Sequence, residues 1–156
     1  MQAQDRLAAR ALLVTPAREV LLMQAEVAPG RLVWFTPGGG LEPGETVHEA
    51  VLRETFEETG RRFEPGTPVW TRTHAFELEG RRIRQSETFF LLPTARFESE
   101  THSFEELERR FFRGYRWWRI DEILGSDELF APRRIGTLLH ELLERGPAQS
   151  PIDAGI

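Results

Sequence analysis

The chain has 156 residues, of which 40% are hydrophobic, 20 are basic and 25 are acidic, and its net charge at pH 7 is −5. It contains no cysteine, and every basic residue is an arginine, which excludes thiol nucleophiles, disulfides, thiolate metal sites and Schiff-base lysines. The acidic balance disfavours a protein that binds duplex nucleic acid through its phosphates.

The hydrophobic content predicts a folded single domain rather than a disordered chain. No apolar run approaches the ~20 residues of a membrane span, and the first ten residues lack the apolar segment of a secretory signal. We therefore expect a cytoplasmic protein without membrane contact. The domain is predicted to cover residues 1–146, and residues 147–156 are expected to form a frayed tail.

Apolar segments separated by turns open the chain. Residues 9–16 and 19–26 are rich in strand-forming side chains and lie two residues apart, which predicts a β-hairpin. A third short strand over residues 31–37 leads into three consecutive glycines at 38–40, where regular structure is expected to end.

A helix is predicted directly after this glycine-rich loop. Thr46 is a suitable N-cap, and Glu49 three residues later completes a capping box. The apolar positions that follow have helical spacing over 47–59, and Gly60 is a natural C-terminal stop.

Further strands and two more helices are predicted in the second half of the chain. Strand signals cover residues 68–78, 83–93 and 114–120. A short helix is expected to start at Asp121, and a longer one covers 132–145, where leucines and isoleucine recur at helical spacing. Strands thus precede and follow the central helix, which predicts a mixed sheet between helices rather than a doubly wound parallel fold.

Three carboxylates are gathered on the predicted central helix. Glu54, Glu57 and Glu58 stand at relative positions 0, 3 and 4 and therefore share one helix face. Their mutual repulsion would be relieved by a hard divalent cation with oxygen ligands. A second interpretation is a solvated surface helix without a metal. Arg53 has the four-residue spacing to pair with Glu57, and acidic helix faces are commonly solvated.

The cluster belongs to a longer pattern, and residues 39–61 resemble the signature of the Nudix hydrolases, G-x5-E-x7-R-E-U-x-E-E-x-G-U, where U is aliphatic. Every charged and glycine position of that signature is present at the correct spacing: Gly39, Glu45, Arg53, Glu54, Glu57, Glu58 and Gly60. Two aliphatic positions differ, because they are occupied by Thr55 and Arg61. Both changes concern packing, and Phe63 is expected to supply the apolar contact that Arg61 does not.

The resemblance implies a fold, a reaction and a cofactor. The fold is an α/β/α sandwich around a mixed β-sheet. The reaction is cleavage of a diphosphate linkage in a small nucleotide-like molecule, by attack of water on phosphorus with Mg²⁺ or Mn²⁺. A homodimer is compatible with the family. Family members act on nucleotides, nucleotide sugars, ADP-ribose and dinucleoside polyphosphates, among others, and the motif does not distinguish between these substrates.

Roles for individual residues also follow from the resemblance. The glutamates that match the family's metal ligands and catalytic carboxylates are Glu54, Glu57 and Glu58. The backbone carbonyl of Gly38 is expected to join them as a ligand. Glu45 and Arg53 match a buried salt bridge that orients the loop against the helix.

The general base and the substrate-binding residues are left open by the sequence. Glu54 is one candidate base, and later carboxylates are others: Glu87, Glu98, Glu100, Glu105, Glu106 and Glu108. Aromatic residues that could stack a base, although packing is favoured for them, are Trp34, Phe90, Tyr115, Trp117 and Trp118. Arginines that could bind phosphate are Arg10, Arg72 and Arg84.

Two other functions fit parts of the pattern. A Nudix-fold module that senses a nucleotide without cleaving it would be favoured by loss of the motif glutamates, and all of them are present. An RNA pyrophosphohydrolase would be favoured by a basic channel, which the acidic balance disfavours. The cysteine-dependent isopentenyl diphosphate isomerases are excluded because the chain has no cysteine.

Overall fold

The computed structural model describes residues 3–64, 66–98 and 111–156. Nine strands and three helices are present in these segments, and their bounds, in chain order, are β1 Gln4–Val14, β2 Glu19–Ala28, β3 Arg31–Phe35, β4 Gly38–Gly40, α1 Val47–Thr59, β5 Thr67–Leu78, β6 Arg81–Pro93, β7 Phe112–Arg119, α3 Ile120–Leu124, β8 Phe130–Ala131, α4 Ile135–Arg145 and β9 Ile152–Asp153. None of the described helices is long and apolar enough to span a membrane.

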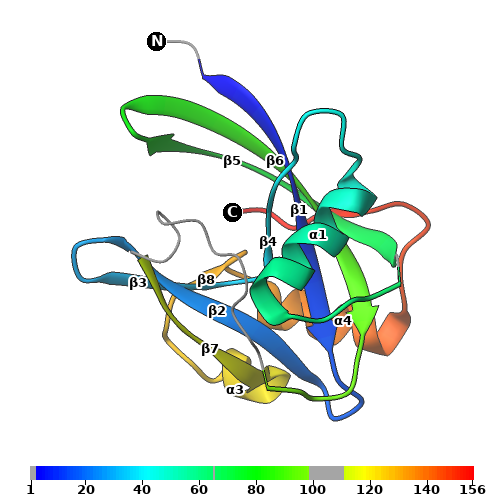
Figure 1. The fold of residues 1–156 in the computed structure, drawn as a ribbon. Coiled ribbons are helices and arrows are strands. Elements are labelled where there is room, and N and C mark those ends of the chain that lie inside the picture. Colours follow the sequence, from blue (N-terminus) through cyan, green and yellow to red (C-terminus); the bar gives the residue numbers. More distant parts are fainter. Residues whose placement is uncertain (1–2, 65, 99–110) are drawn as a thin grey trace.

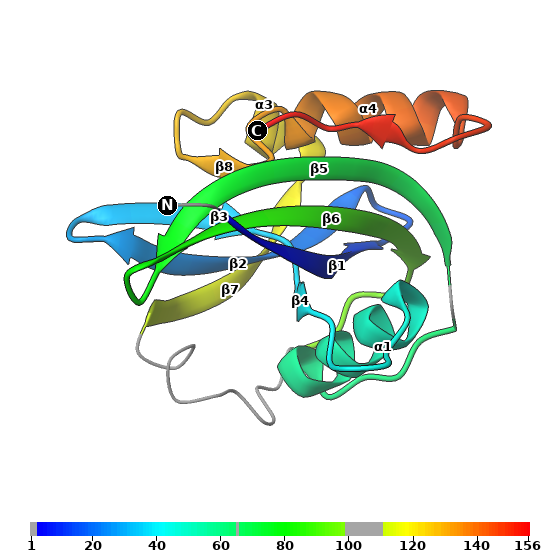
Figure 2. The same cartoon turned by 90° about the horizontal axis from the view of Figure 1, so that it is seen from above.

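The strands form one curled sheet in the order β8-β3-β2-β1-β6-β5-β9, with β4 paired to β1 and β7 paired to β2. The pairs β1–β6, β3–β8 and β5–β9 are parallel, and the other pairs are antiparallel. The predicted mixed sheet in a single domain is therefore confirmed. Figure 2 shows α1 on one face of the sheet and α4 on the other.

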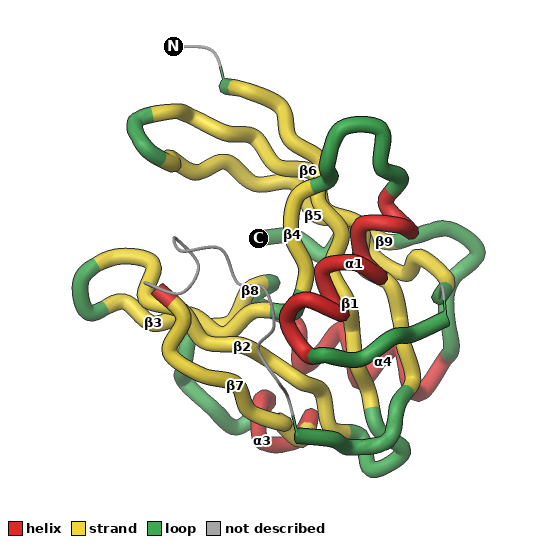
Figure 3. Tube along the Cα trace, in the orientation of Figure 1, coloured by secondary structure: helices red, strands yellow, loops and turns green. Residues whose placement is uncertain are grey.

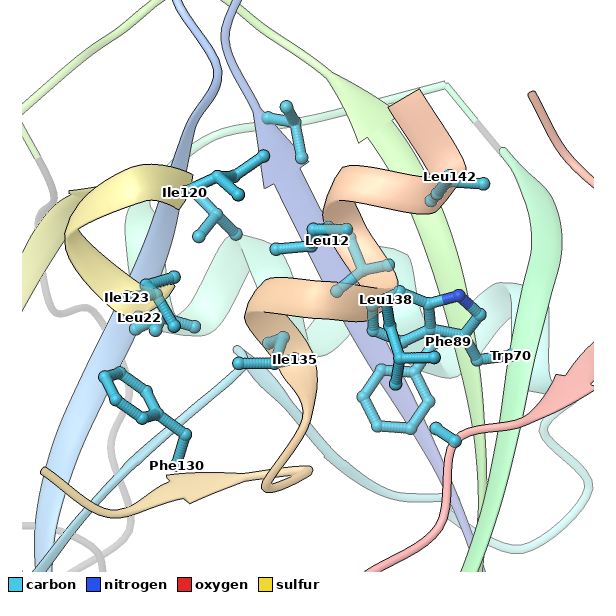
Figure 4. Packing of buried hydrophobic residues seen from close by; sticks show 14 of the residues in the cluster. Leu12, Leu22, Trp70, Phe89, Ile120, Ile123, Phe130, Ile135, Leu138 and Leu142 are labelled. Atoms are coloured by element: carbon cyan, nitrogen blue, oxygen red, sulfur yellow. The ribbon is translucent and has the colours of Figure 1, made fainter. Parts of the chain in front are cut away.

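From Ala8 onward the central strand β1 is largely buried on both faces, which explains the nearly continuous apolar run of this part. Leu12 and Val14 belong to a core cluster that includes the apolar face of α4. Figure 4 shows Leu138 and Leu142 of that helix pointing toward the same cluster. On the other face, Ala9, Ala11 and Leu13 pack with Ala50 and Val51 of α1.

Helix α1 begins and ends as its local sequence predicts. Thr46 accepts a hydrogen bond from the Glu49 backbone N–H, and the Glu49 side chain accepts one from the Thr46 N–H. Gly60 has a left-handed φ of 76° and donates its N–H to Phe56 O. Because both ends are satisfied locally, the helix holds its carboxylates at a fixed register against the sheet.

The two departures from the aliphatic positions of the motif are absorbed by packing. Thr55 is fully buried, and its hydroxyl donates to the Val51 carbonyl one turn earlier, at 2.5 Å. The Arg61 guanidinium lies over the Phe97 ring, 4.7 Å from its centroid. Phe63 packs against the core cluster on the α1 side, as expected from the sequence.

The predicted hairpin of residues 9–16 and 19–26 is present only at its turn. Val14 and Val20 are the one registered pair between β1 and β2. Beyond this pair, β1 continues along β6 and β4, and β2 continues along β3 and β7. The hairpins β2–β3 and β5–β6 therefore diverge (Figure 1). Figure 3 shows β1 and β4 at the point where the two hairpins separate.

The C-terminal tail is more ordered than predicted. Residues 152–153 form β9, which pairs with β5, and the Ala154 N–H donates to Thr71 O at 2.7 Å. Ala154 is buried, and the carbonyl of Ile156 accepts from the Arg133 N–H at 2.9 Å. The expectation of a frayed tail was wrong for these residues, because β5 offers an open edge that the tail can extend.

Candidate active site

The glycine-rich segment and helix α1 form one assembly at the centre of the sheet. β4 pairs antiparallel with β1, which places Gly38 opposite Arg10. The Gly38 N–H donates to Glu58 Oε1 at 2.8 Å. A side chain at Gly38 would clash with the backbone of Ala9, and its φ is 142°. Only glycine can bring the backbone this close to the helix carboxylate.

Gly39 makes a second close approach to the helix. A Cβ atom at this position would lie 2.7 Å from Glu54 Oε1 and 2.8 Å from Glu54 Cδ. A side chain at this position would therefore have to displace the Glu54 carboxylate. Glu54 and Glu58 are both buried, with exposed fractions of 8% and 5%. The loop thus covers two of the three predicted metal ligands.

Arg53 connects the loop to the helix carboxylates. Its Nε and Nη2 donate to the two oxygens of Glu45, at 2.7 and 2.9 Å. The same Nη2 donates to the Gly40 carbonyl at 3.0 Å. Its Nη1 lies 3.0 Å from Glu54 and 3.3 Å from Glu57. The structure therefore contains both the motif pair with Glu45 and the four-residue pair with Glu57.

These contacts shift the titration of both partners. The hydrogen bond from Arg53 lowers the pKa of Glu45 below its ordinary value, although partial burial opposes this shift. The pKa of Arg53 is raised, first by its bond to Glu45 and then by the charge of Glu54. Both side chains are therefore ionised at neutral pH, and the bidentate geometry fixes the orientation of the guanidinium.

The donor set at this point suits a hard divalent cation. Carboxylates of Glu54, Glu57 and Glu58 and the Gly38 carbonyl are all oxygen ligands. Within the described segments, however, no three His, Cys, Asp or Glu side chains converge closely enough to hold an ion. The residues fit a metal ion by donor type and by their shared helix face. In this structure Arg53 Nη1 lies between the carboxylates of Glu54 and Glu57.

A cavity of about 1050 Å³ opens beside this assembly. Gly38, Gly39 and Glu58 form part of its wall. Most of the remaining wall comes from the two diverging hairpins, β2–β3 and β5–β6, and the rest from β1, the start of β7, residues 129–133 and Ile156. Its volume is slightly above the ~300–1,000 Å³ typical of small-molecule sites.

A buried charge cluster lies at the wall of this cavity. Glu87 on β6 is 2% exposed and accepts from Arg10 Nε at 2.7 Å and from Arg72 Nη1 at 2.8 Å. Gln85 Nε2 donates to the same carboxylate at 3.0 Å, and His74 Nε2 lies 3.6 Å from it. Arg10 Nη1 also donates hydrogen bonds to the carbonyls of Thr36 and Gly38, at 3.2 and 3.1 Å.

The position of Glu87 argues against a role as general base. Burial alone would raise its pKa, but Arg10, His74 and Arg72 outweigh burial and hold the pKa well below its ordinary value. A carboxylate this acidic and saturated with donors is a poor proton acceptor. Arg10 and Arg72, which were open phosphate-binding candidates, have guanidinium groups that pair with Glu87.

We expect this cluster to make stability depend on pH in the acid range. Because the pKa of Glu87 is lower in the folded state than its ordinary 4.5, its contribution is complete above that value and is lost as pH falls through the folded-state pKa. Urea unfolding from pH 7 to pH 3 should show the stability difference between wild type and Glu87→Gln shrinking as pH falls. A difference that stays constant would contradict this prediction.

The other open candidates lie elsewhere. The aromatic side chains named from the sequence are buried or packed, as favoured, and none of them lines the cavity: Trp34, Phe90, Tyr115, Trp117 and Trp118. Arg84 pairs on the surface with Asp5. Glu98 accepts a hydrogen bond from the Tyr115 hydroxyl at 3.4 Å. The candidates Glu100, Glu105, Glu106 and Glu108 lie outside the described residues.

Several cavity residues were not identified from the sequence. They include Phe35, His74, Phe76 and Gln85. The available signal was the alternation in β5, where Arg72, His74 and Phe76 share one face. Alternation alone does not say whether that face meets a core or a cavity.

The chain resembles known proteins in sequence. Residues 4–139 match the family described as NUDIX domain. The putative mutator protein MutT4 of Mycobacterium tuberculosis is 31% identical over 126 residues, which cover 78% of this chain and 48% of that protein. Human 8-oxo-dGDP phosphatase NUDT18 is 40% identical over 70 residues, 40% of this chain and 22% of that protein. The chain thus spans less than half the length of these curated relatives.

Solved structures show the same fold. A MutT NUDIX hydrolase from Burkholderia pseudomallei superposes with a TM-score of 0.67 at 24% identity, covering 89% of this chain and 98% of that one. A Caenorhabditis elegans Ap4A hydrolase binary complex gives a TM-score of 0.61 at 22% identity, covering 89% of this chain and 96% of that one.

Proposed function

This chain belongs to the NUDIX domain family, and on that basis we propose that it hydrolyses the phosphoanhydride bond of a nucleoside diphosphate derivative. Relatives with this domain are named as nucleotide hydrolases, among them a nucleoside triphosphatase of Enterobacter and the 8-oxo-dGDP phosphatase already described. The proposed reaction is attack of water on phosphorus with release of two phosphorylated products or of phosphate.

One observation carries the proposal. The glycine-rich strand closes onto helix α1 beside a cavity large enough for a nucleotide, and Glu54 lies against Gly39, which lines that cavity. Glu58 lines that cavity directly and is held by the Gly38 N–H. A solvated acidic helix face, the alternative interpretation of this cluster, would show neither the burial of Glu54 nor a cavity beside Glu58.

The chain's own residues supply binding and orientation. Arg53 fixes Glu45, Glu54 and the Gly40 carbonyl relative to one another, so loop and helix carry the carboxylates as one unit. Glu54, Glu57 and Glu58, with the Gly38 carbonyl, would hold the divalent ion that family members generally use. We propose Mg²⁺ or Mn²⁺ because all the donors are oxygens. When bound, the ion neutralises diphosphate charge and makes water a better nucleophile.

Substitution of Glu57 tests this proposal. Glu57→Gln keeps the size of the side chain and removes its charge, and we expect kcat to fall at least about 100-fold, which corresponds to roughly 2.7 kcal/mol of barrier. The measurement is release of phosphate or pyrophosphate from a panel of nucleoside triphosphates, nucleotide sugars, ADP-ribose and dinucleoside polyphosphates, with Mg²⁺ or Mn²⁺.

Glu141→Gln is the matched control, because Glu141 is exposed on α4, on the opposite face of the sheet. It should leave turnover unchanged. Turnover that persists in Glu57→Gln would contradict the assigned role. If wild type turns over none of the compounds but binds a nucleotide saturably, the proposed hydrolase activity is contradicted and a nucleotide-sensing module is indicated instead.

A further inference from the structure

Three polar side chains in the cavity wall, those of Arg72, His74 and Gln85, have a buried atom without a hydrogen-bond partner in the described part of the chain. His74 Nε2 lies 3.6 Å from a Glu87 oxygen, which leaves Arg72 and Gln85 as the two with atoms available to a ligand. Arg72 is 8% exposed and Gln85 is 2% exposed, and both line the cavity. Arg72 Nε and Gln85 Oε1 are buried and have no hydrogen-bond partner in the described part of the chain. An unsatisfied buried polar atom is unfavourable, so a ligand that satisfied both would gain affinity at this point.

The two atoms lie on neighbouring strands of the β5–β6 hairpin. Arg72 is registered opposite Glu87, and His74 opposite Gln85. Arg72 and Gln85 are therefore diagonal neighbours on one face, with Cα atoms roughly 7–8 Å apart, within reach of long side chains. One ligand group can meet both of them.

Glu87 determines which atoms remain available. It occupies Arg72 Nη1 and Gln85 Nε2 at 2.8 and 3.0 Å. The amide of Gln85 is thereby oriented with its oxygen as the unused acceptor, while Arg72 retains its Nε–H as an unused donor. The ligand must consequently offer one acceptor and one donor side by side.

This demand distinguishes between classes of ligand. A fully ionised phosphate has acceptors for Arg72, but it has no donor for the Gln85 oxygen. A heterocycle that carries an N–H next to a carbonyl or ring nitrogen satisfies both atoms without added charge. The cavity also presents flat or apolar side chains suited to a ring, among them Met23, Val33, Phe35 and Phe76.

We propose that Arg72 and Gln85 bind the hydrogen-bonding edge of the substrate's nucleobase, with Glu87 as the anchor that orients them. The inference rests on the proposed function, since it places the base of the substrate in the same cavity that Glu58 lines. Arg72 and Gln85 are then specificity-determining residues, and the preferred substrates are nucleotides rather than polyanions without a heterocycle.

Binding of ligands that lack a phosphoanhydride bond tests the inference. The probes are AMP, GMP, CMP and UMP, compared by calorimetry with ribose 5-phosphate, which has the sugar and phosphate but no base. We expect at least one nucleotide to bind wild type about tenfold or more tighter than ribose 5-phosphate, the equivalent of one or two hydrogen bonds. Equal binding of all five, or binding of none, would overturn the inference.

Two variants identify the atoms involved. Gln85→Met keeps the length of the side chain and removes the acceptor, and Arg72→Lys keeps the charge beside Glu87 and removes the Nε–H. Each should reduce the nucleotide's advantage over ribose 5-phosphate several-fold. Arg84→Lys is the control, because Arg84 is an exposed residue of the same strand and does not line the cavity. Variants that weaken the binding of the nucleotide and of ribose 5-phosphate equally would show that Arg72 and Gln85 do not recognise the base.

A modified base makes the test independent of folding. The N–H edge is blocked in N1-methyl-GMP and N6,N6-dimethyl-AMP, so wild type should lose most of its preference for the better of the parent nucleotides, whereas Gln85→Met should be insensitive to methylation. These measurements need no turnover. Base-dependent binding without hydrolysis would contradict only the proposed function. Hydrolysis without base-dependent binding would contradict only this inference.

Discussion

Replacing Glu87 by leucine is expected to destabilise the protein by about 3–5 kcal/mol, because the substitution leaves buried guanidinium groups without a counter-charge. Arg72 is 8% exposed and Arg10 17% exposed in their side chains, and both depend on this carboxylate. Gln85 Nε2 loses its acceptor as well. Urea unfolding at pH 7 with fluorescence detection of the tryptophans measures the change.

Glu77→Leu is the matched control, because Glu77 is an exposed position of the adjacent strand β5. Its effect should stay within about 0.5 kcal/mol, as for most surface substitutions. If Glu87→Leu costs no more than this control, the cluster of two arginines and one glutamate contributes no net stability. That result would contradict the structural role assigned to it.

Replacing Arg53 by lysine is expected to lower kcat/KM about 100-fold while leaving the fold intact. An ammonium group cannot make the two parallel bonds to Glu45 while also reaching Gly40 and Glu54, as the planar guanidinium does. The loop would then be free to shift relative to the helix, and a misplacement of ~1 Å near the reacting centre can cost about 10²-fold. Steady-state kinetics on the best substrate of the panel measures the loss.

Arg145→Lys makes the same chemical change on α4, at an exposed position, and should leave kcat/KM unchanged. The melting temperature of Arg53→Lys should remain close to that of wild type, since Arg53 is partly exposed. A variant with full activity would show that Arg53 is dispensable for positioning. A variant that is inactive and unfolded would show a purely structural role.

Features encoded within a few residues of one another were predictable from the sequence. Helix α1 has its cap, its capping box and its terminal glycine inside residues 46–60, and the structure reproduces each of them. The apolar face of α4 likewise follows from spacing alone. These elements are determined by local hydrogen bonds and periodicity, which a single sequence displays.

Features that depend on distant strands were not predictable. The pairing of Glu87 with Arg10 joins side chains 77 residues apart, and neither residue shows in sequence that it is buried. For the same reason, Glu87 remained a candidate base and Arg72 a phosphate ligand until their partners were known. The tail was misjudged because its order comes from the edge of β5, and the position of that edge is a property of the whole sheet.

The parallel alignment of β1 with β6 also bears on how the chain folds. The first strand runs beside β6 along its whole length, from Gln4 opposite Ile83 to Val14 opposite Pro93. Such a pairing has a high contact order. The entropic cost of closing so long a loop is incurred before the stabilising contacts between the two strands form. During synthesis, β1 leaves the ribosome early and must wait for about 80 further residues before its partner exists. The apolar segment at its centre is exposed for that interval, so the rate of refolding and the tendency to aggregate should both depend on this one strand pair.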